Sequence, residues 1–390
     1  MSTTPLTRRR TARTVVGTAV ACLLVLWLAP PSTAKPRVPT ARVVVSGLNN
    51  PRQVWRDRTG KLFVAEAGRG GSLCEGTGEE AQCIGATGSV ARIRYPGSTV
   101  NGTFQRVVTG LLSASGPDGS FAVGSDGVST HDGRIYVQMT YAPPDQIPAP
   151  LPSAQAGKLL KARSFRTPTV VADISSVEFS TPNPDGYVDP KTGKPELDSN
   201  PYAVLALDGR QLIADAAGNT IIEARPGKAP RVFAVLPQHG SSSTDRQATP
   251  TALAQGPNGT ILVGELAHEE EHEARVTVLS SSGRYLGFIG RGGSIIDVPG
   301  GFTTITGVAY RAGKLYVSEL FAGGTPQTPG QLTRVTWEKH PELSRINVPY
   351  PAGVAVDPAR NVFVAAWSIA PATGAFGAPN SAGQVWRVRF

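Results

Sequence analysis

Residues 250–265 read PTALAQGPNGTILVGE, and this stretch decides the fold. A mostly apolar run is followed by Pro257-Asn-Gly259 and by a second run rich in Ile, Leu and Val. An Asn-Gly pair between two such runs supplies the positive-φ turn of a tight β-hairpin. The second run ends in a small residue and an acid, Gly264-Glu265. We therefore interpret the stretch as a hairpin whose second strand is buried.

The same unit recurs along the chain. Six copies share the apolar strand, the polar turn and the second strand, and the second copy is the weakest: residues 51–66, 127–139, 201–215, 250–265, 307–319 and 351–366. Outer strands are expected to follow each pair, for example over 89–93, 220–224 and 275–279. Six such units predict an all-β fold, a six-bladed β-propeller.

The two ends of the chain are expected to close this ring. Residues 42–45 and 384–388 are both strand-like, and their pairing in one blade would leave neither strand as an open edge. A β-helix and a pair of β-sandwiches are the alternatives, and the acid-ended repeat disfavours both. The 44 glycines and 33 prolines among 390 residues exclude a coiled coil or helical bundle, because these residues break helices.

The first 34 residues resemble a secretory signal peptide. Arg8, Arg9, Arg10 and Arg13 precede a mostly apolar run over 15–29, and cleavage is predicted after Ala34. A transmembrane helix is the alternative, but the run is shorter than the ~18–20 residues that a span needs. We expect a secreted, extracellular protein with a single propeller domain over 35–390, without a membrane span after cleavage.

Cleavage removes four arginines and lowers the formal net charge from +9 to +5. The remaining Lys and Arg are scattered, so nucleic-acid binding is not expected, and we expect a monomer. In an oxidising compartment Cys74 and Cys83, nine residues apart in a Gly-rich stretch, are expected to form a disulfide, with two free thiols as the alternative. Loop insertions are expected over about 68–88 and 142–200.

Several stretches resemble a known family of secreted propellers. They are residues 47–52 (GLNNPR), 64–70 (VAEAGRG), 87–90 (TGSV), 183–186 (NPDG), 198–202 (DSNPY), 214–220 (ADAAGNT) and 250–253 (PTAL). The repeat is similar to those of NHL and gluconolactonase-like propellers, and more closely to the ScyD/ScyE family of secreted bacterial proteins. This resemblance implies an extracellular propeller whose biochemical activity is undefined.

An acid stands six residues after the turn glycine in four of the repeats. These residues are Glu66, Asp215, Glu265 and Glu319, and equivalent positions of a propeller lie on a ring around its axis. Four carboxylates near one channel repel one another unless a cation or Lys/Arg neutralises them. A Ca²⁺ site with Asn200 or Asn219 as neutral ligands is one interpretation. The other is that each acid accepts hydrogen bonds inside its own blade.

Two further segments carry candidate residues. The loop over 181–201 contains Asp198 and Asn200 next to the third inner strand, where loops on a rigid ring often meet ligands. Residues 268–272 (HEEEH) match the HExxH pattern of zinc proteases, which requires both histidines on one helix face. No apolar helix surrounds the pattern, and we expect a solvated loop.

The sequence thus predicts a non-enzymatic binding module for a small molecule, glycan or protein. Its ligand-binding residues would be Asp198, Asn200, Asp215, Asn219, Glu66, Glu265 and Glu319. The alternative is a Ca²⁺-dependent, lactonase-like hydrolase that uses the same acids, Glu66, Asp215, Glu265 and Glu319 holding the metal. No catalytic residues are assigned, because no nucleophile motif such as Gly-x-Ser-x-Gly is present.

Overall fold

The computed structural model describes Met1 and residues 38–390, except 79–80, 95–101, 181–182, 190–191, 240–246, 268–270, 294 and 376. The predicted signal peptide therefore lies outside the described residues, apart from Met1. Residues Val38–Phe390 form one compact unit. Within the described residues no helix is long and apolar enough to cross a bilayer.

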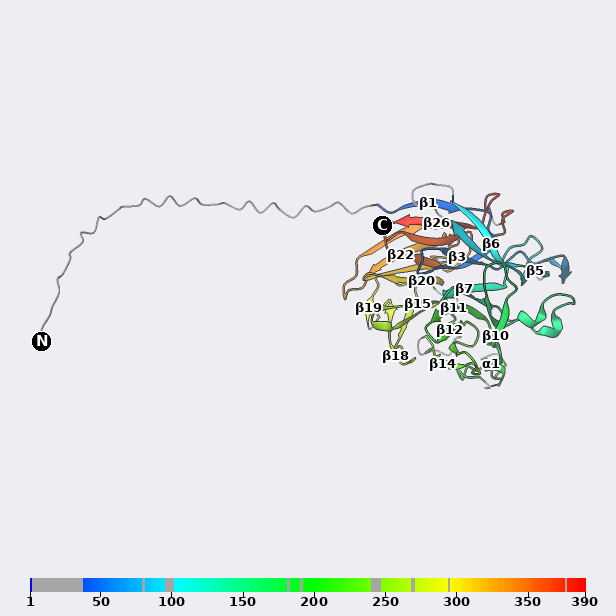
Figure 1. The fold of residues 1–390 in the computed structure, drawn as a ribbon, viewed down its shortest axis with the longest axis horizontal. Coiled ribbons are helices and arrows are strands. Elements are labelled where there is room, and N and C mark those ends of the chain that lie inside the picture. Colours follow the sequence, from blue (N-terminus) through cyan, green and yellow to red (C-terminus); the bar gives the residue numbers. More distant parts are fainter. Residues whose placement is uncertain are drawn as a thin grey trace. The chain divides into compact units, whose positions relative to one another are not determined.

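The compact unit is a six-bladed β-propeller, as the repeat predicts (Figure 1). Each inner strand is the end strand of its sheet, and the next strand along the chain pairs with it in antiparallel fashion. The six inner strands are β2 (Pro51–Arg56), β7 (Ser125–His131), β11 (Pro201–Leu207), β15 (Pro250–Gln255), β20 (Ile305–Arg311) and β24 (Val354–Val356). The second strands are β3 (Leu62–Glu66), β8 (Arg134–Met139), β12 (Arg210–Asp215), β16 (Ile261–Glu265), β21 (Lys314–Glu319) and β25 (Val362–Ala366).

The outer strands complete the blades. They are β5 (Gln82–Arg94) and β6 (Thr103–Ser115) in blade 1, β9 (Lys158–Ala162) and β10 (Thr169–Asp173) in blade 2, β13 (Thr220–Ala224) and β14 (Arg231–Val235) in blade 3, β17 (Val276–Leu279), β18 (Tyr285–Gly290) and β19 (Ile296–Asp297) in blade 4, and β22 (Gln331–Thr336) and β23 (Leu343–Asn347) in blade 5. In blade 6, β1 (Thr40–Val45) pairs with β26 (Gln384–Arg389), so the two ends close the ring as predicted.

The hydrophobic core is divided among the interfaces between blades. In the described part of the chain, six clusters of buried apolar residues each combine side chains of two neighbouring blades. The cluster between blades 6 and 1 joins Val64 of β3 to Phe363 of β25. Because the last interface is packed like the others, the ring is closed by apolar burial as well as by strand pairing.

One expected insertion is wrong in part. Residues 142–200 are not one long loop, because they contain β9 and β10, the two outer strands of blade 2. Residues 158–162 and 169–173 form these strands. Their short apolar runs lie among prolines and glycines, so the sequence pattern did not predict them. The irregular parts are 140–157, with the short helices η2 (Pro144–Gln146) and η3 (Ser153–Gln155), and the segment after β10, which starts with α1 (Ser176–Ser180).

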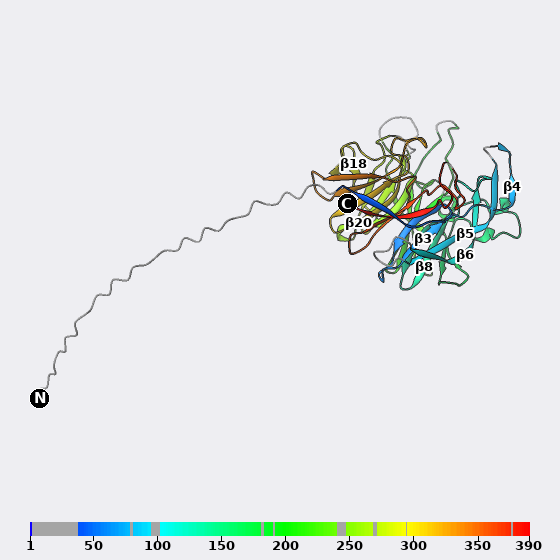
Figure 2. The ribbon, with the colours of Figure 1, turned by 90° about the horizontal axis from the view of Figure 1, so that it is seen from above.

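The other insertion forms an arm on blade 1. The strand β4 (Leu73–Glu75) pairs with the first residues of β5, and Cys74 lies opposite Cys83 in this pair. The two cysteines form the predicted disulfide. The arm stands out from the side of the propeller (Figure 2).

The turn between β24 and β25 forms without the glycine that the other repeats have. Arg360 occupies the turn position there with φ 63°, a left-handed conformation that glycine normally supplies. The Asp357 side chain accepts hydrogen bonds from the main chain and side chain of Asn361, which hold this turn.

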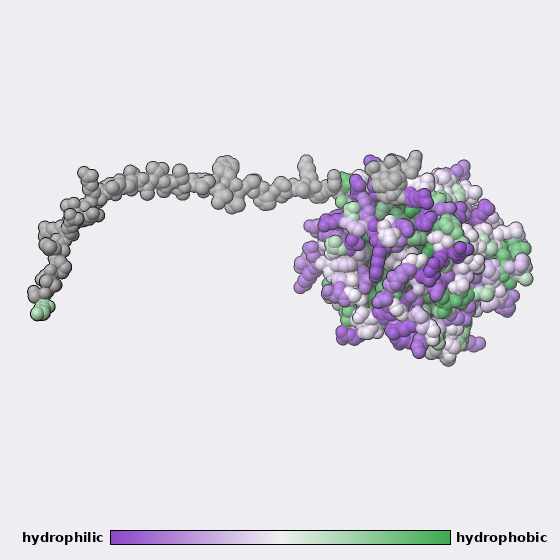
Figure 3. Space-filling view, viewed as in Figure 1, coloured by the Kyte–Doolittle hydropathy of each residue, from purple (hydrophilic) through white to green (hydrophobic). Residues whose placement is uncertain are grey.

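Strongly hydrophilic residues are spread over the face seen in Figure 3, with apolar residues between them.

Candidate functional site

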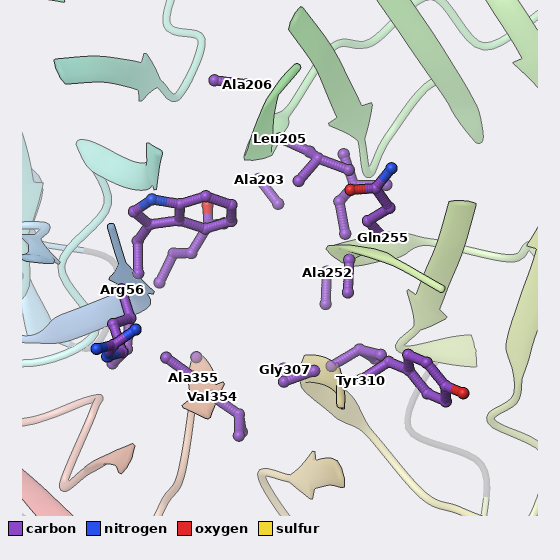
Figure 4. Close-up of a pocket in the computed structure, with 18 of the residues that line it drawn as sticks. Arg56, Ala203, Leu205, Ala206, Ala252, Gln255, Gly307, Tyr310, Val354 and Ala355 are labelled. Carbon is purple, nitrogen blue, oxygen red and sulfur yellow. The ribbon is translucent and has the colours of Figure 1, made fainter. Parts of the chain in front are cut away.

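The inner strands surround an axial cavity of about 650 Å³. Its wall comes from the inner strands of all six blades, and small residues leave the centre open. Ala203, Ala252, Gly307 and Ala355 surround a common space, with Arg56 on one side and Tyr310 and Gln255 on the other (Figure 4). Inner strands that are end strands turn their unpaired edges toward this space, so backbone N–H and C=O groups contribute to the wall.

The cavity opens at the end where the inner strands finish and their hairpin turns begin. Lining residues near the start of the strands, such as Thr251 and Gly307, are buried, whereas Arg58, Asp208 and Arg311 at the turns are exposed. Depth therefore runs from the turns toward the first residues of the inner strands.

The wall offers an aromatic surface as well as backbone groups. Trp55 of β2 is half-buried and lines the cavity, and its indole Nε1 donates to Thr130 Oγ1 of the neighbouring blade at 2.9 Å. This hydrogen bond fixes the ring between blades 1 and 2. Tyr310 of β20 contributes a second half-buried aromatic side chain, packed against Trp337 with ring centroids 5.1 Å apart.

Gln53 links three blades inside the channel. Its Nε2 donates to Val204 O at 2.9 Å, and its Oε1 accepts from Val128 N and Val204 N, each at 3.1 Å. One side chain of β2 thereby satisfies edge groups of β7 and β11. This polar bridge occupies Val128 N–H and both main-chain groups of Val204, so a ligand would meet other groups of the strand edges.

A buried ion pair lies at the start of the same strands. Arg52 Nε is 3.4 Å from Asp126 Oδ1, and the two residues are 7% and 1% exposed. Burial raises the pKa of Asp126 to about 6, against the opposing effect of the Arg52 charge. The pair joins blade 1 to blade 2 at the deep end of the inner strands.

The predicted acids lie at this deep end and outside the cavity lining. Each acid ends a second strand and pairs in register with the first residue of the inner strand: Pro51 with Glu66, Pro201 with Asp215, Pro250 with Glu265 and Ile305 with Glu319. All four side chains are at most 1% exposed. Repeat symmetry thus places them at equivalent positions, one strand away from the axis.

Each acid is occupied within its own blade. Glu66 forms a two-point ion pair with Arg106, at 2.7 Å and 3.0 Å, and also accepts Asn49 N–H and the Ser89 hydroxyl. Glu265 meets Arg275 Nε at 2.9 Å and His239 Nε2. These two carboxylates are neutralised by cations of the protein.

The other two acids have no cation in contact among the described residues. Asp215 accepts the Ser199 hydroxyl and Asn200 N–H at 2.6 and 2.7 Å. Burial raises the pKa of Asp215. Glu319 accepts Thr303 N–H, the Gln331 amide and the Thr333 hydroxyl at 2.8–3.0 Å, and burial raises its pKa to about 7. This geometry agrees with the interpretation in which each acid accepts hydrogen bonds inside its own blade.

No shared metal geometry accompanies these acids. Among the residues that the structure describes, no three His, Cys, Asp or Glu side chains are grouped so that they could hold one metal ion. The four acids stand in four separate blades, each one strand away from the axis, and the Ca²⁺ site stays a prediction.

The remaining candidates gather on blade 3. Asn200 Oδ1 accepts the Thr140 hydroxyl at 2.9 Å, and Asn219 Nδ2 donates to Asp185 and Gln247 at 2.8 and 2.9 Å. Asp198 is exposed and accepts Ser199 N–H at 2.8 Å. The structure thus brings Asp198, Asn200, Asp215 and Asn219 to one loop end, while Glu66, Glu265 and Glu319 remain apart.

Glu178 of α1 is a member of this blade 3 group that the sequence did not reveal. It is 2% exposed, and its Oε2 lies 2.9 Å from the position a Cβ would take on Gly218. Burial, together with Asp215, Asp185 and Asp198, raises the pKa of Glu178 to about 8. Of the HEEEH segment, residues 268–270 lie outside the described residues, and residues 271–272 are part of a turn.

The sequence prediction missed the cavity residues because it followed the four repeated acids, here called the acid column (Glu66, Asp215, Glu265 and Glu319), which end the second strands. Arg56, Trp55 and Tyr310 stand near the ends of the inner strands, just before the hairpin turns. Small residues inside the inner strands, such as Ala203 and Gly307, were the available signal, because they leave room at the axis of a closed ring.

Comparisons with known proteins support the fold. No family model matches the chain, and no curated protein matches it. A putative oxidoreductase (glucose dehydrogenase) from Thermus thermophilus is 13% identical, with 90% of this chain and 100% of that chain covered and a TM-score of 0.50. A streptogramin B lyase is 11% identical over 90% of this chain and 97% of that one, with a TM-score of 0.48.

A gluconolactonase from Xanthomonas campestris is 11% identical over 89% of this chain and 96% of that one, with a TM-score of 0.42. At these identities the likeness concerns the fold alone. The resemblance to NHL, gluconolactonase-like and ScyD/ScyE proteins stays a prediction.

Proposed function

We propose that this protein is a secreted, non-enzymatic module that binds a small ligand in its axial cavity. The observation that carries the proposal is the open space of about 650 Å³ at the centre of the ring. Small-ligand sites in proteins are concave, mostly apolar and about 300–1,000 Å³ in volume, with a few polar groups that fix orientation. The cavity has this size, and its wall combines polar and apolar groups in similar measure.

The strands of the cavity wall are held in fixed positions, which favours binding of a ligand without a large rearrangement. Every inner strand is held by its own sheet, and the blade interfaces on both sides are packed with buried apolar residues. A ligand therefore meets strand edges and the half-buried Trp55 ring in positions that are already fixed, which lowers the entropic cost of binding.

The secreted location is supported by two features. The N-terminal 34 residues have the arrangement of a signal peptide, and Cys74 and Cys83 form a disulfide, a bond that persists in oxidising compartments. The alternative function, a Ca²⁺-dependent lactonase, would require at least part of the acid column to share an ion. The carboxyl groups of the described residues do not favour it, because they are engaged separately in their blades.

A fluorescence titration tests the binding proposal. N-phenyl-1-naphthylamine is a small, neutral aromatic probe that becomes fluorescent in apolar sites. We expect it to bind the mature protein with one-to-one stoichiometry and to quench Trp55, which lines the cavity. Trp55→Phe should remove most of the probe-induced quenching, whereas the control Trp386→Phe, in β26 of blade 6, should leave it in place.

The two variants decide where the probe lies. Equal quenching in Trp55→Phe and wild type would place the probe outside the cavity and overturn the proposal, as would an absence of binding. A partner that binds the mature protein at the same affinity whether or not the probe is present would point to a different, surface-binding function.

A further inference from the structure

Arg56 is a half-buried guanidinium in the cavity wall without a carboxylate partner among the described residues. Its Nη2 lies 2.8 Å from the position a Cβ would take on Gly60, so the side chain folds over its own hairpin turn. In the described structure, the only hydrogen bond of its side chain goes from Nη1 to Asp57 O at 3.5 Å. No carboxylate oxygen of the described residues comes within 4.0 Å of it.

Three other arginines set against the interior of this protein are paired with carboxylates, whereas half-buried Arg92 and Arg334 lie over the rings of Phe165 and Phe390. Arg106, Arg210 and Arg275 meet Glu66, Glu223 and Glu265 at 2.7–3.0 Å. A partly buried charge is costly unless it is paired, since the low-dielectric surroundings weaken its hydration. Arg56 therefore has the donors, the position and the lack of a partner that an anion-binding guanidinium requires.

The charge around Arg56 has the same sign. The charged residues that line the cavity are four arginines (Arg56, Arg58, Arg210 and Arg311) and two aspartates (Asp57 and Asp208), with His131 as a further titratable group.

Since Arg210 is paired with Glu223, three arginines stand against the two aspartates, a formal excess of one positive charge. Asp57 accepts Lys61 N–H and the Thr59 hydroxyl, both at 2.8 Å, within its own turn. Asp208 is fully exposed at a hairpin tip. The mouth of the cavity thus has a small formal excess of positive charge, which favours anions over cations.

We propose that the cavity selects a small organic anion, whose carboxylate, phosphate or sulfonate group binds Arg56 while its apolar body lies deeper against Trp55 and the small residues of the wall. This inference rests on the proposed function, because it names the chemical class of the ligand for the same cavity. Arg58 and Arg311, both exposed at the rim, attract the anion to the mouth.

A matched pair of probes tests the proposal. 8-Anilinonaphthalene-1-sulfonate has the aromatic skeleton of N-phenyl-1-naphthylamine with one added sulfonate. Hydrogen bonds to a charged group contribute ~1.5–3 kcal/mol, so Arg56→Gln should raise the Kd of the sulfonate probe about tenfold or more. The Kd of the neutral probe should change less than about twofold, because it makes no ionic contact.

Two controls separate the guanidinium of Arg56 from general charge and from misfolding. Arg166→Gln removes an exposed arginine in the turn between β9 and β10 and should leave both Kd values unchanged. Arg56→Lys keeps the charge but loses the forked donor geometry, so it should give an intermediate Kd for the sulfonate probe. Unchanged melting temperatures show that the variants are folded.

The outcomes distinguish this inference from the proposed function. If both probes bind and quench Trp55, but Arg56→Gln weakens them equally or not at all, the anion selectivity is wrong and the cavity still binds small ligands. If neither probe quenches Trp55, the proposed function itself fails. If Arg166→Gln weakens the sulfonate probe as much as Arg56→Gln does, the effect is general electrostatics, and the inference is overturned.

Discussion

Glu319→Gln gives the sharpest test of the role assigned to the acid column. The side chain is 1% exposed, accepts three hydrogen bonds within blade 5 and has no cation in contact among the described residues. Glutamine has almost the same shape and keeps an oxygen for Thr303 N–H. The substitution therefore removes the ionisation of residue 319 while it leaves the packing nearly intact.

The expected magnitude follows from the pKa of Glu319. Burial raises this pKa from 4.5 to about 7, so the folded protein holds the proton more tightly than the unfolded chain. The resulting stabilisation is fully present below about pH 4.5 and is lost as the pH rises through about 7. A difference of about 2.5 pKa units corresponds to ~3 kcal/mol of unfolding free energy at about 1.36 kcal/mol per unit.

Urea unfolding of the mature protein at pH 5 and pH 8.5 measures this effect. The wild type should lose stability relative to Glu319→Gln between the two pH values, by ~3 kcal/mol at most, because the variant cannot ionise at this position. Glu338→Gln, an exposed change in the same blade, controls for the general effect of removing one negative charge.

A constant difference between wild type and Glu319→Gln at both pH values would refute the reasoning. It would mean that the three hydrogen-bond donors stabilise the carboxylate enough to offset its burial. A wild type that gains stability on addition of Ca²⁺, and loses that gain in Glu319→Gln, would instead support the cation interpretation of the acid column.

Three further predictions concern stability. Glu178→Gln should raise the melting temperature relative to wild type at pH 9 but not at pH 5, because the pKa of Glu178 is raised to about 8 and the stabilisation by its bound proton is lost as the pH rises from about 4.5 through 8; an equal change at both pH values would contradict this. Cys83→Ser should cost ~2–3 kcal/mol of unfolding free energy, and a reductant should lower the stability of the wild type by a similar amount and leave the variant unaffected. Arg106→Met should cost ~2–3 kcal/mol, because Glu66 would stay buried without its cation; a loss well below about 1 kcal/mol would show that Asn49 N–H and the Ser89 hydroxyl suffice.

The sequence predicts the ring well because turn residues mark the end of one strand and the start of the next in each repeat. The turn at Asn258–Gly259 has both residues at positive φ, and the strands on either side pair in the expected register. Closure by residues 42–45 and 384–388 was also predictable, since a strand at each end of a closed ring has one natural partner. Blade 2 was harder, because its outer strands are separated from the hairpin by the irregular chain over 140–157.

The candidate site was less predictable, for a geometric reason. Repeat symmetry reveals which residues occupy equivalent positions, but it does not reveal whether those positions face the axis or the interior of a blade. The acids fall on the second strands and are used locally, whereas Arg56 and Trp55 fall on an inner strand and face the cavity. The partners of the buried acids, such as Arg106, 40 residues from Glu66, depend on tertiary contacts that no local pattern contains.

Methyl NMR of alanine-labelled protein tests the central claim most directly. Ala203, Ala252 and Ala355 lie in the cavity wall, whereas Ala81 and Ala114 line a second hollow of about 550 Å³ on blade 1. If the axial cavity binds small ligands, addition of N-phenyl-1-naphthylamine will shift the methyl signals of the first group and leave those of Ala81 and Ala114 in place. Shifts confined to Ala81 and Ala114, with the cavity alanines unchanged, would contradict the account.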